Sequence, residues 1–250
     1  MKFQFRLFSN SAIASWKQLR VVAAGESFQV EANGKLLQSV LNKPLCFPSV
    51  HFAYLFAEEW AIAGQDPKTI VNSPVTMATQ RAHLLWGKEE ARQECIQECC
   101  KFLQTDTVLF WTQQQEEDSL LRQRQVQQWK RLIDWINEKF AFDSEALLTF
   151  TDTLKSPVSA SQMQAFAEWL HQLSHWTLAG FELATKITKS AIIATAMHEG
   201  RLDSGDAFRL SQLEEHYQME KWGKIPELHE VAQADYQRLM ALANVMMHQA

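Results

Sequence analysis

The sequence predicts an α+β fold, with a small β-rich N-terminal domain followed by a larger all-helical C-terminal domain. Residues 16–48 contain alternating apolar positions and the pair Asn33-Gly34, which favours a two-residue hairpin turn because both positions tolerate positive φ. From about residue 88 onward, apolar residues recur with the helical period. These two patterns, in this order, define the fold class.

The domain boundaries follow from where the pattern changes. We place the β-rich domain, with one helix, at residues 16–80 and the helical domain at residues 81–250. Ser49 is a suitable N-cap for the helix of the first domain, which should run to about Ala63. The segment 65–80 contains two prolines and several β-branched residues, so we expect loop and extended chain there.

The C-terminal domain is predicted to consist of a series of amphipathic helices. Trp129, Leu132 and Ile136 illustrate the apolar stripe that each helix should turn toward a core. Gly200 and Gly223 are typical of residues that end helices. The expected helices span residues 88–104, 119–140, 160–173, 175–199, 204–222 and 227–248.

Composition and charge exclude several classes of protein. The chain has 250 residues, 46% of them hydrophobic and 21% charged, which is typical of a globular protein. A formal net charge of -5 gives no support to nucleic-acid binding. The longest apolar stretches are too short to span a bilayer, so we do not expect an integral membrane protein.

The N-terminus has a different charge pattern from the rest. Residues 1–22 contain four basic residues and no acid. Residues 1–15 lack the long apolar region of a secretory signal, which leaves a short transit leader or a frayed terminus. The four cysteines include Cys95, Cys99 and Cys100, whose spacing matches neither a disulfide framework nor a zinc site. We expect buried thiols and a reducing compartment.

The residues that would carry catalysis are absent or badly placed. The eight glycines are isolated and form no phosphate-binding loop. His171 and His175 are spaced i, i+4 and could share a metal, but no nearby Asp, Glu or Cys at ligand spacing completes a site. Glu58 and Glu59 are adjacent, so on a helix they diverge by about 100° and on their own lack the common focus that paired catalytic carboxylates need. We expect no catalytic residue, no metal site and no cofactor.

Several short strings carry a family resemblance. Together they resemble the F1-ATPase assembly chaperone family, the chaperones of the F1 α subunit of mitochondrial and α-proteobacterial ATP synthase, and the likeness runs over about residues 16–240. The strings, in chain order, are "AEEWA" (57–61), "KFLQTDTVLF" (101–110), "Q-x3-W-x5-W" from Gln125, "KSAIIATAM" (189–197) and "LEEHYQMEKWG" (213–223).

The resemblance implies a function without chemistry. A member would be an ATP-independent chaperone that binds the unassembled α subunit of F1, prevents its aggregation and promotes F1 assembly. It would be a monomer in the mitochondrial matrix, with a bacterial cytoplasm as the alternative. Two other functions stay open: a helical scaffold with a different partner, and a hydrolase or metal enzyme that uses the Glu58/Glu59 or His171/His175 pair. The chain departs from the family pattern at Ala61 and at residues 226–230.

The resemblance also selects candidate site residues. A surface that mixes carboxylates with aromatic or Met anchors suits reversible capture of a partner. The expected partner-binding residues are Glu59, Glu214, Glu215, Gln218, Met219 and Trp222. The expected structural residues are Trp60 in the core, Asp106 in a turn or cap, the helix-packing pair Gln125 and Trp129, and Gly223 at a helix end. An internal hydrogen bond is the alternative for Glu59.

Overall fold

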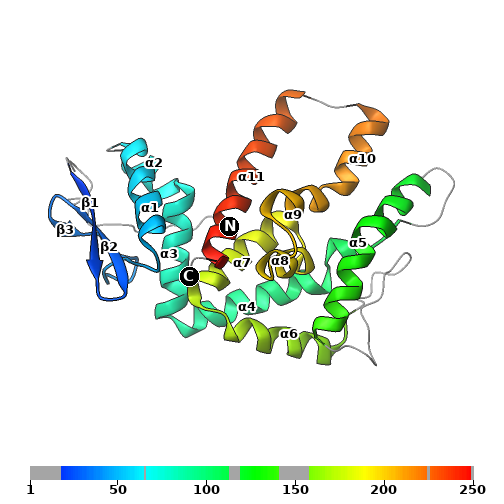
Figure 1. Ribbon diagram of the computed structural model, residues 1–250, viewed down its shortest axis with the longest axis horizontal. Coiled ribbons are helices and arrows are strands. Elements are labelled where there is room, and N and C mark those ends of the chain that lie inside the picture. The colour runs from blue at the N-terminus through cyan, green and yellow to red at the C-terminus, as the bar shows by residue number, and fades with distance from the viewer. Residues whose placement is uncertain (1–17, 65, 113–118, 141–157, 224–225, 249–250) are drawn as a thin grey trace. The chain divides into compact units, whose positions relative to one another are not determined.

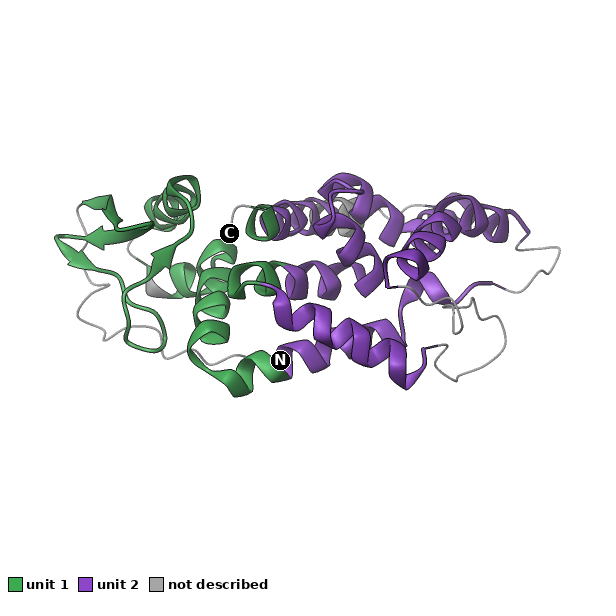
Figure 2. Cartoon of the chain, turned by 60° about the horizontal axis from the view of Figure 1, so that its bottom comes forward, with its two compact units in different colours: residues 1–93, 174–180, 245–250 green, residues 94–173, 181–244 purple. Residues whose placement is uncertain are grey.

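The computed structural model describes residues 18–64, 66–112, 119–140, 158–223 and 226–248. For residues 67 and 226–232 it describes the backbone but not the side chains. The leader expected at residues 1–15 lies outside them. The chain divides into two compact units (Figure 2). Unit 1 comprises residues 1–93, 174–180 and 245–250, and unit 2 comprises residues 94–173 and 181–244. The proposed domain boundary after residue 80 stays a prediction.

A small antiparallel sheet opens unit 1 (Figure 1). Its strands are β1 (Leu19–Ala24), β2 (Ser27–Ala32), β3 (Lys35–Leu36) and β4 (Cys46–Phe47). Strand β2 pairs with all three others, and Val21 of β1 lies opposite Val30. Asn33 and Gly34 both have positive φ, 52° and 74°, in the hairpin turn between β2 and β3. The expected turn is therefore confirmed.

Three helices follow the sheet in unit 1. They are α1 (Val50–Ala63), α2 (Pro67–Asn72) and α3 (Pro74–Gly87). The Ser49 hydroxyl accepts a hydrogen bond from the Phe52 amide, which confirms the N-cap of α1. The prediction of loop and extended chain over residues 65–80 is wrong. Both prolines occupy the first helical position, where the missing N–H has no partner to lose, so they begin helices.

The remaining helices largely match the expected periodicity. They are α4 (Glu89–Gln104), α5 (Ser119–Lys139), α6 (Ala160–Gln172), α7 (His175–Thr188), α8 (Ala191–His198), α9 (Ser204–Ser211), α10 (Leu213–Trp222) and α11 (Pro226–His248), with a 3-10 turn, η1, at Thr107–Leu109. The α+β fold class, with its β-rich start and helical remainder, is confirmed. In the part of the chain that the structure describes, no helix has the length and apolar character needed to cross a bilayer.

Two expected helices are each broken in two. The helix expected over 175–199 is interrupted at Lys189, which has φ 53°, and Ser190 caps the new helix α8. The helix expected over 204–222 is interrupted at Gln212. Apolar periodicity continues through both breaks, so it could not reveal them.

The core of unit 2 explains the aromatic and cysteine content of the helices. Trp129 and Phe181 are fully buried, and Phe166 is 1% exposed. Cys95 and Cys99 are buried free thiols, as the sequence predicted. Burial raises the pKa of the neighbouring Cys100 thiol to about 11, so this thiol stays protonated and unreactive near neutral pH.

Candidate partner-binding surface

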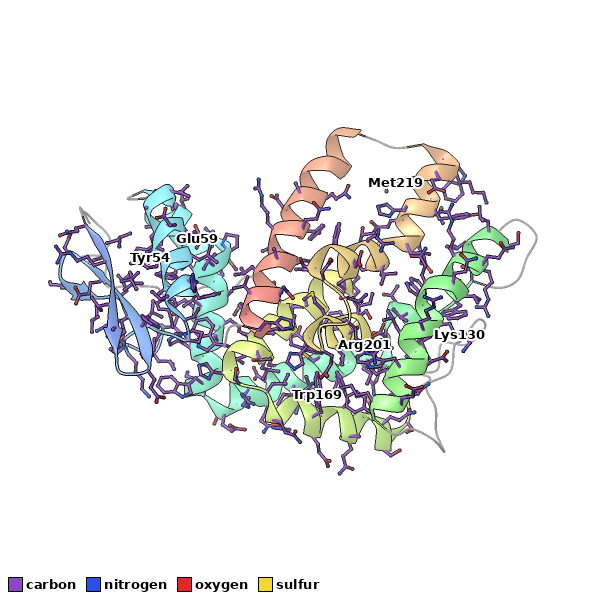
Figure 3. All side chains as sticks on the ribbon, in the orientation of Figure 1. Tyr54, Glu59, Lys130, Trp169, Arg201 and Met219 are labelled. Atoms are coloured by element: carbon purple, nitrogen blue, oxygen red, sulfur yellow. The ribbon has the colours of Figure 1, made fainter. Side chains whose placement is uncertain are left out.

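Helix α10 in unit 2 carries most of the candidate residues. Leu213 and Tyr217 face the core, with exposed fractions of 4% and 6%. Glu215 is exposed, and Met219, labelled in Figure 3, is half-buried. Trp222 is 71% exposed, which is unusual for so large an apolar side chain. The helix thus has an inner apolar stripe and an outer edge that mixes acids with Met and Trp.

Glu214 is anchored to helix α5. Its side-chain oxygen accepts a hydrogen bond of 2.8 Å from the amide nitrogen of Gln125, which is fully buried. The Gln125 oxygen in turn accepts from the Thr112 backbone amide at 3.0 Å. Burial raises the pKa of Glu214 above its ordinary value, although the Gln125 hydrogen bond acts in the opposite direction. Glu214 therefore has a structural contact as well as a place beside the outer edge.

Two further contacts tie α5 to the segment that carries α10. The indole N–H of Trp129 donates to the Leu210 carbonyl at 3.1 Å. Arg124 forms a 2.7 Å ion pair with Glu220. The Arg124–Glu220 pair is solvent-exposed and contributes little to stability, so the buried Trp129 and Gln125 contacts fix the helix position.

Gln218 and Gly223 complete the α10 set. The side-chain oxygen of Gln218 is shielded from solvent and has no hydrogen-bond partner among the residues described. Gly223 ends the helix with φ 93°, and its N–H donates to the Met219 carbonyl at 2.9 Å. A residue with a side chain is strained at this φ, which explains a glycine at this position.

Glu59 has a different environment, in unit 1. Its carboxylate accepts hydrogen bonds from the backbone amides of Val75 at 2.7 Å and Thr76 at 2.8 Å, and from the Thr76 hydroxyl at 2.9 Å. Ser73, at the N-cap position of α3, makes no side-chain cap bond. Glu59 therefore caps α3 from the neighbouring helix α1. Burial raises its pKa, against the effect of these hydrogen bonds.

Trp60 is fully buried next to this cap. Its indole N–H donates to the same Thr76 hydroxyl oxygen at 3.0 Å. Glu58, one residue from Glu59 and so about 100° away around the helix, is exposed. The two carboxylates of α1 thus diverge and do not face a common atom. The geometry accounts for Glu59 without a partner and leaves its binding role a prediction.

Asp106 is a fully buried cap in unit 2. Its two carboxylate oxygens accept from the Val108 amide at 3.1 Å and from the Ile192 amide at 3.0 Å. These amides begin η1 and α8, so one carboxylate joins two helix starts. Burial raises the pKa of Asp106 to about 7, even though the hydrogen bonds favour the charged form.

Sequence reasoning missed the partners of these residues. Thr76 and Thr112 supply the groups that pair with Glu59 and Gln125. Thr76 lies in the segment expected to be loop and extended chain, and Thr112 lies outside the expected helices. No periodic signal marks such a long-range hydrogen bond. Across the described ranges, no three His, Cys, Asp or Glu side chains come together in a way that could hold a metal ion.

Comparison with known proteins identifies the family. Residues 14–137 match the family model described as ATP12 chaperone protein. Over 241 residues the chain is 27% identical to the mitochondrial protein atp12 of Schizosaccharomyces pombe, covering 92% of this chain and 80% of that protein. The chain belongs to the ATP12 chaperone family. This family is the F1-ATPase assembly chaperone family that the sequence motifs resembled.

Other ATP12 relatives extend the comparison. The mitochondrial protein ATP12 of Saccharomyces cerevisiae is 26% identical over 164 residues, covering 58% of this chain and 50% of that protein. The crystal structure of Atp12 from Paracoccus denitrificans matches with a TM-score of 0.78 at 21% identity, covering 96% of this chain and 98% of that one. A chaperone candidate from Agrobacterium tumefaciens matches with a TM-score of 0.75 at 24% identity, covering 93% and 83%. The fold is therefore shared with bacterial proteins, and the sequence similarity extends to fungal mitochondrial ones.

Proposed function

We propose that this ATP12-family chaperone binds the unassembled α subunit of the F1 sector, without nucleotide, and prevents its aggregation until F1 assembles. The proposed contact is the outer edge of α10, formed by Glu214, Glu215, Gln218, Met219 and Trp222. The observation that carries the proposal is the exposure of Trp222, at 71%, on a helix that also presents carboxylates.

The composition of this edge suits capture followed by release. An unassembled subunit exposes the apolar surface that its neighbour will later cover, and such surfaces aggregate. Trp222 and Met219 can cover apolar area, because aromatic and Met side chains dominate contact energy. Glu214 and Glu215 add charge that sets orientation and discourages self-association.

We place this activity in the mitochondrial matrix, with the chaperone acting as a monomer. The support is that the two fungal relatives are named as mitochondrial proteins. A bacterial cytoplasm is the alternative, since Paracoccus denitrificans has an Atp12. Fractionation of the native cells and sedimentation of the purified chain test the compartment and the monomer.

Capture of isolated subunits tests the proposed partner. The purified chain should retain α subunit but not β subunit in a pull-down without ATP, and should suppress aggregation of α subunit. Equal capture of both subunits, or capture of neither, contradicts the proposal.

Trp222→Ser tests the proposed surface in the same assay. It should weaken capture of α subunit about tenfold, because removal of an exposed aromatic anchor costs roughly 1–2 kcal/mol of binding. The melting temperature should barely change, since Trp222 is largely exposed already. Tyr236→Ser, at a 47% exposed aromatic of α11, is the matched control and should capture normally. Normal capture by Trp222→Ser removes α10 from the contact.

A further inference from the structure

Helix α1 carries large apolar side chains on its outer side as well as its inner side. Only Glu58 and Glu59 are charged among its 14 residues. Phe52, Phe56 and Trp60 fill the inner side and are at most 1% exposed. A surface helix normally has a polar outer side, and a helix that is apolar all round is usually covered. The outer side of α1 therefore has the composition of an interface.

Six exposed residues make up this outer side, which we call the α1 outer face. They are His51, Tyr54, Leu55, Glu58, Ala61 and Ile62. With about 100° between successive residues, they lie within a sector of about 120°, and Glu58 lies in the middle. Ile62 is 84% exposed, Tyr54 54% and Leu55 40%. Figure 3 labels Tyr54 from this face and Glu59, the cap, from beside it.

The central carboxylate has no partner among the residues that the structure describes. Glu59, its neighbour, accepts three hydrogen bonds from Val75 and Thr76. Glu58 makes no hydrogen bond and no ion pair with any described residue. An exposed carboxylate flanked by apolar side chains favours a partner that places a cation opposite it. A partner with an anion or an apolar group at that point would bind less well, because the carboxylate would be repelled or left unpaired.

We propose that the α1 outer face docks an apolar patch of the captured F1 subunit, with a Lys or Arg of that patch against Glu58. This inference rests on the proposed function and adds a second contact, on unit 1, to the α10 edge on unit 2. Tyr54, Leu55 and Ile62 provide the apolar contact area, and the ion pair at Glu58 fixes how the partner is aligned on the face.

A second copy of this chain fits the face poorly. Contact between two copies is normally two-fold symmetric, so the centre of the face meets its own counterpart. Where that two-fold axis passes through Glu58, two unpaired carboxylates would meet inside an apolar contact. Such a juxtaposition costs several kcal/mol. One helix face is also small against the roughly 800 Å² per partner of a stable interface. A cation-bearing partner held at a second site avoids both problems.

The test combines cross-linking with charge reversal in the full chain. A benzophenone side chain at position 62 reports what lies on the face, and the same group at position 36, in β3 of the same unit, is the control. Purified chain is mixed with α subunit, with β subunit, or with neither, and irradiated. In parallel, Glu58→Lys is compared with Glu26→Lys, which makes the same charge change at an exposed turn of unit 1. Melting curves check that both variants fold.

We expect an α-subunit adduct from position 62 and little from position 36. Glu58→Lys should weaken capture about tenfold, with Glu26→Lys unchanged. If wild type captures α subunit but position 62 forms no adduct and Glu58→Lys captures normally, the face proposal is overturned and the proposed function stands. If wild type captures neither subunit and no subunit adduct forms, both are overturned. An adduct to a second copy, or to the chain's own residues, also overturns the face proposal.

Discussion

At the scale of single residues, Asp106 shows how one buried carboxylate can organise several backbone groups. Its oxygens accept from the amides of Val108 and Ile192, which belong to segments 84 residues apart in the sequence. The cost is the burial of a charge, which raises the pKa of Asp106 to about 7. The residue lies in the "TDT" string that the sequence marked as a turn or cap.

Asp106→Asn should destabilise the fold by about 1–3 kcal/mol, because one amide nitrogen would then face a backbone N–H donor. Asp203→Asn is the control, because Asp203 is an exposed N-cap and Asn caps equally well. Urea unfolding measures both variants. A neutral result for Asp106→Asn would show that the hydrogen bonds at this residue contribute nothing.

The pH dependence of the same variant has a definite sign. Because the pKa of Asp106 is raised to about 7 from 3.8, the folded state binds more protons than the unfolded state between these values. The free energy of unfolding contributed by this group therefore falls as pH rises from about 4 to 7. Asp106→Asn has no group that titrates at this position. The free energies of unfolding of wild type and variant should therefore differ less as pH rises over that range.

At the scale of elements, α1 and α3 are coupled by a borrowed cap. Ser73 stands at the N-cap of α3 but makes no side-chain bond there, and Glu59 on α1 supplies the acceptors instead. The buried indole of Trp60 adds a bond to Thr76 in the same first turn. The start of α3 thus depends on the position of α1.

Glu59→Ala should lower the free energy of unfolding by about 1–2 kcal/mol, which is the usual cost of a lost helix cap. The melting temperature should fall by roughly 2–8 °C in a chain of this size. Glu58→Ala is a matched control on the adjacent, exposed residue and should change the melting temperature little. Equal effects of the two substitutions would show that the cap does not stabilise α3.

At the scale of the whole molecule, folding and capture overlap at Glu214. The residue lies beside the proposed contact edge, but its side chain also accepts from the buried Gln125 amide. Reversing its charge therefore removes a structural acceptor as well as a charge. If such a variant loses capture, a second substitution at Glu214 is needed to show whether a partner contact or the fold was affected.

Glu214→Gln and Glu214→Lys separate the two roles. The Gln variant keeps an acceptor for Gln125 and should unfold within about 0.5 kcal/mol of wild type, while capture of α subunit weakens. The Lys variant should lose capture and also about 1–3 kcal/mol of stability, because the Gln125 amide is left buried and unpaired. Full capture by the Gln variant would mean that the charge of Glu214 plays no part.

The sequence by itself determined the fold class, the hairpin turn and most of the helices, because these depend on local φ preferences and on apolar periodicity. It also determined the family, through short strings in a fixed order. The sequence did not predict the helix breaks at Lys189 and Gln212, since the apolar stripe continues through both. The two prolines of residues 65–80 misled it, because a proline can begin a helix as well as end one.

Only the tertiary structure decided which side chains are anchors and which are surface. Glu58 and Glu59 are neighbours of the same type, yet one is exposed and the other caps α3. Glu214 and Glu215 differ in the same way, through a hydrogen bond to Gln125 on α5. The reason is physical: the role of a carboxylate depends on hydrogen-bond donors from segments that are distant in the sequence, and no local sequence pattern predicts which donors will lie beside it.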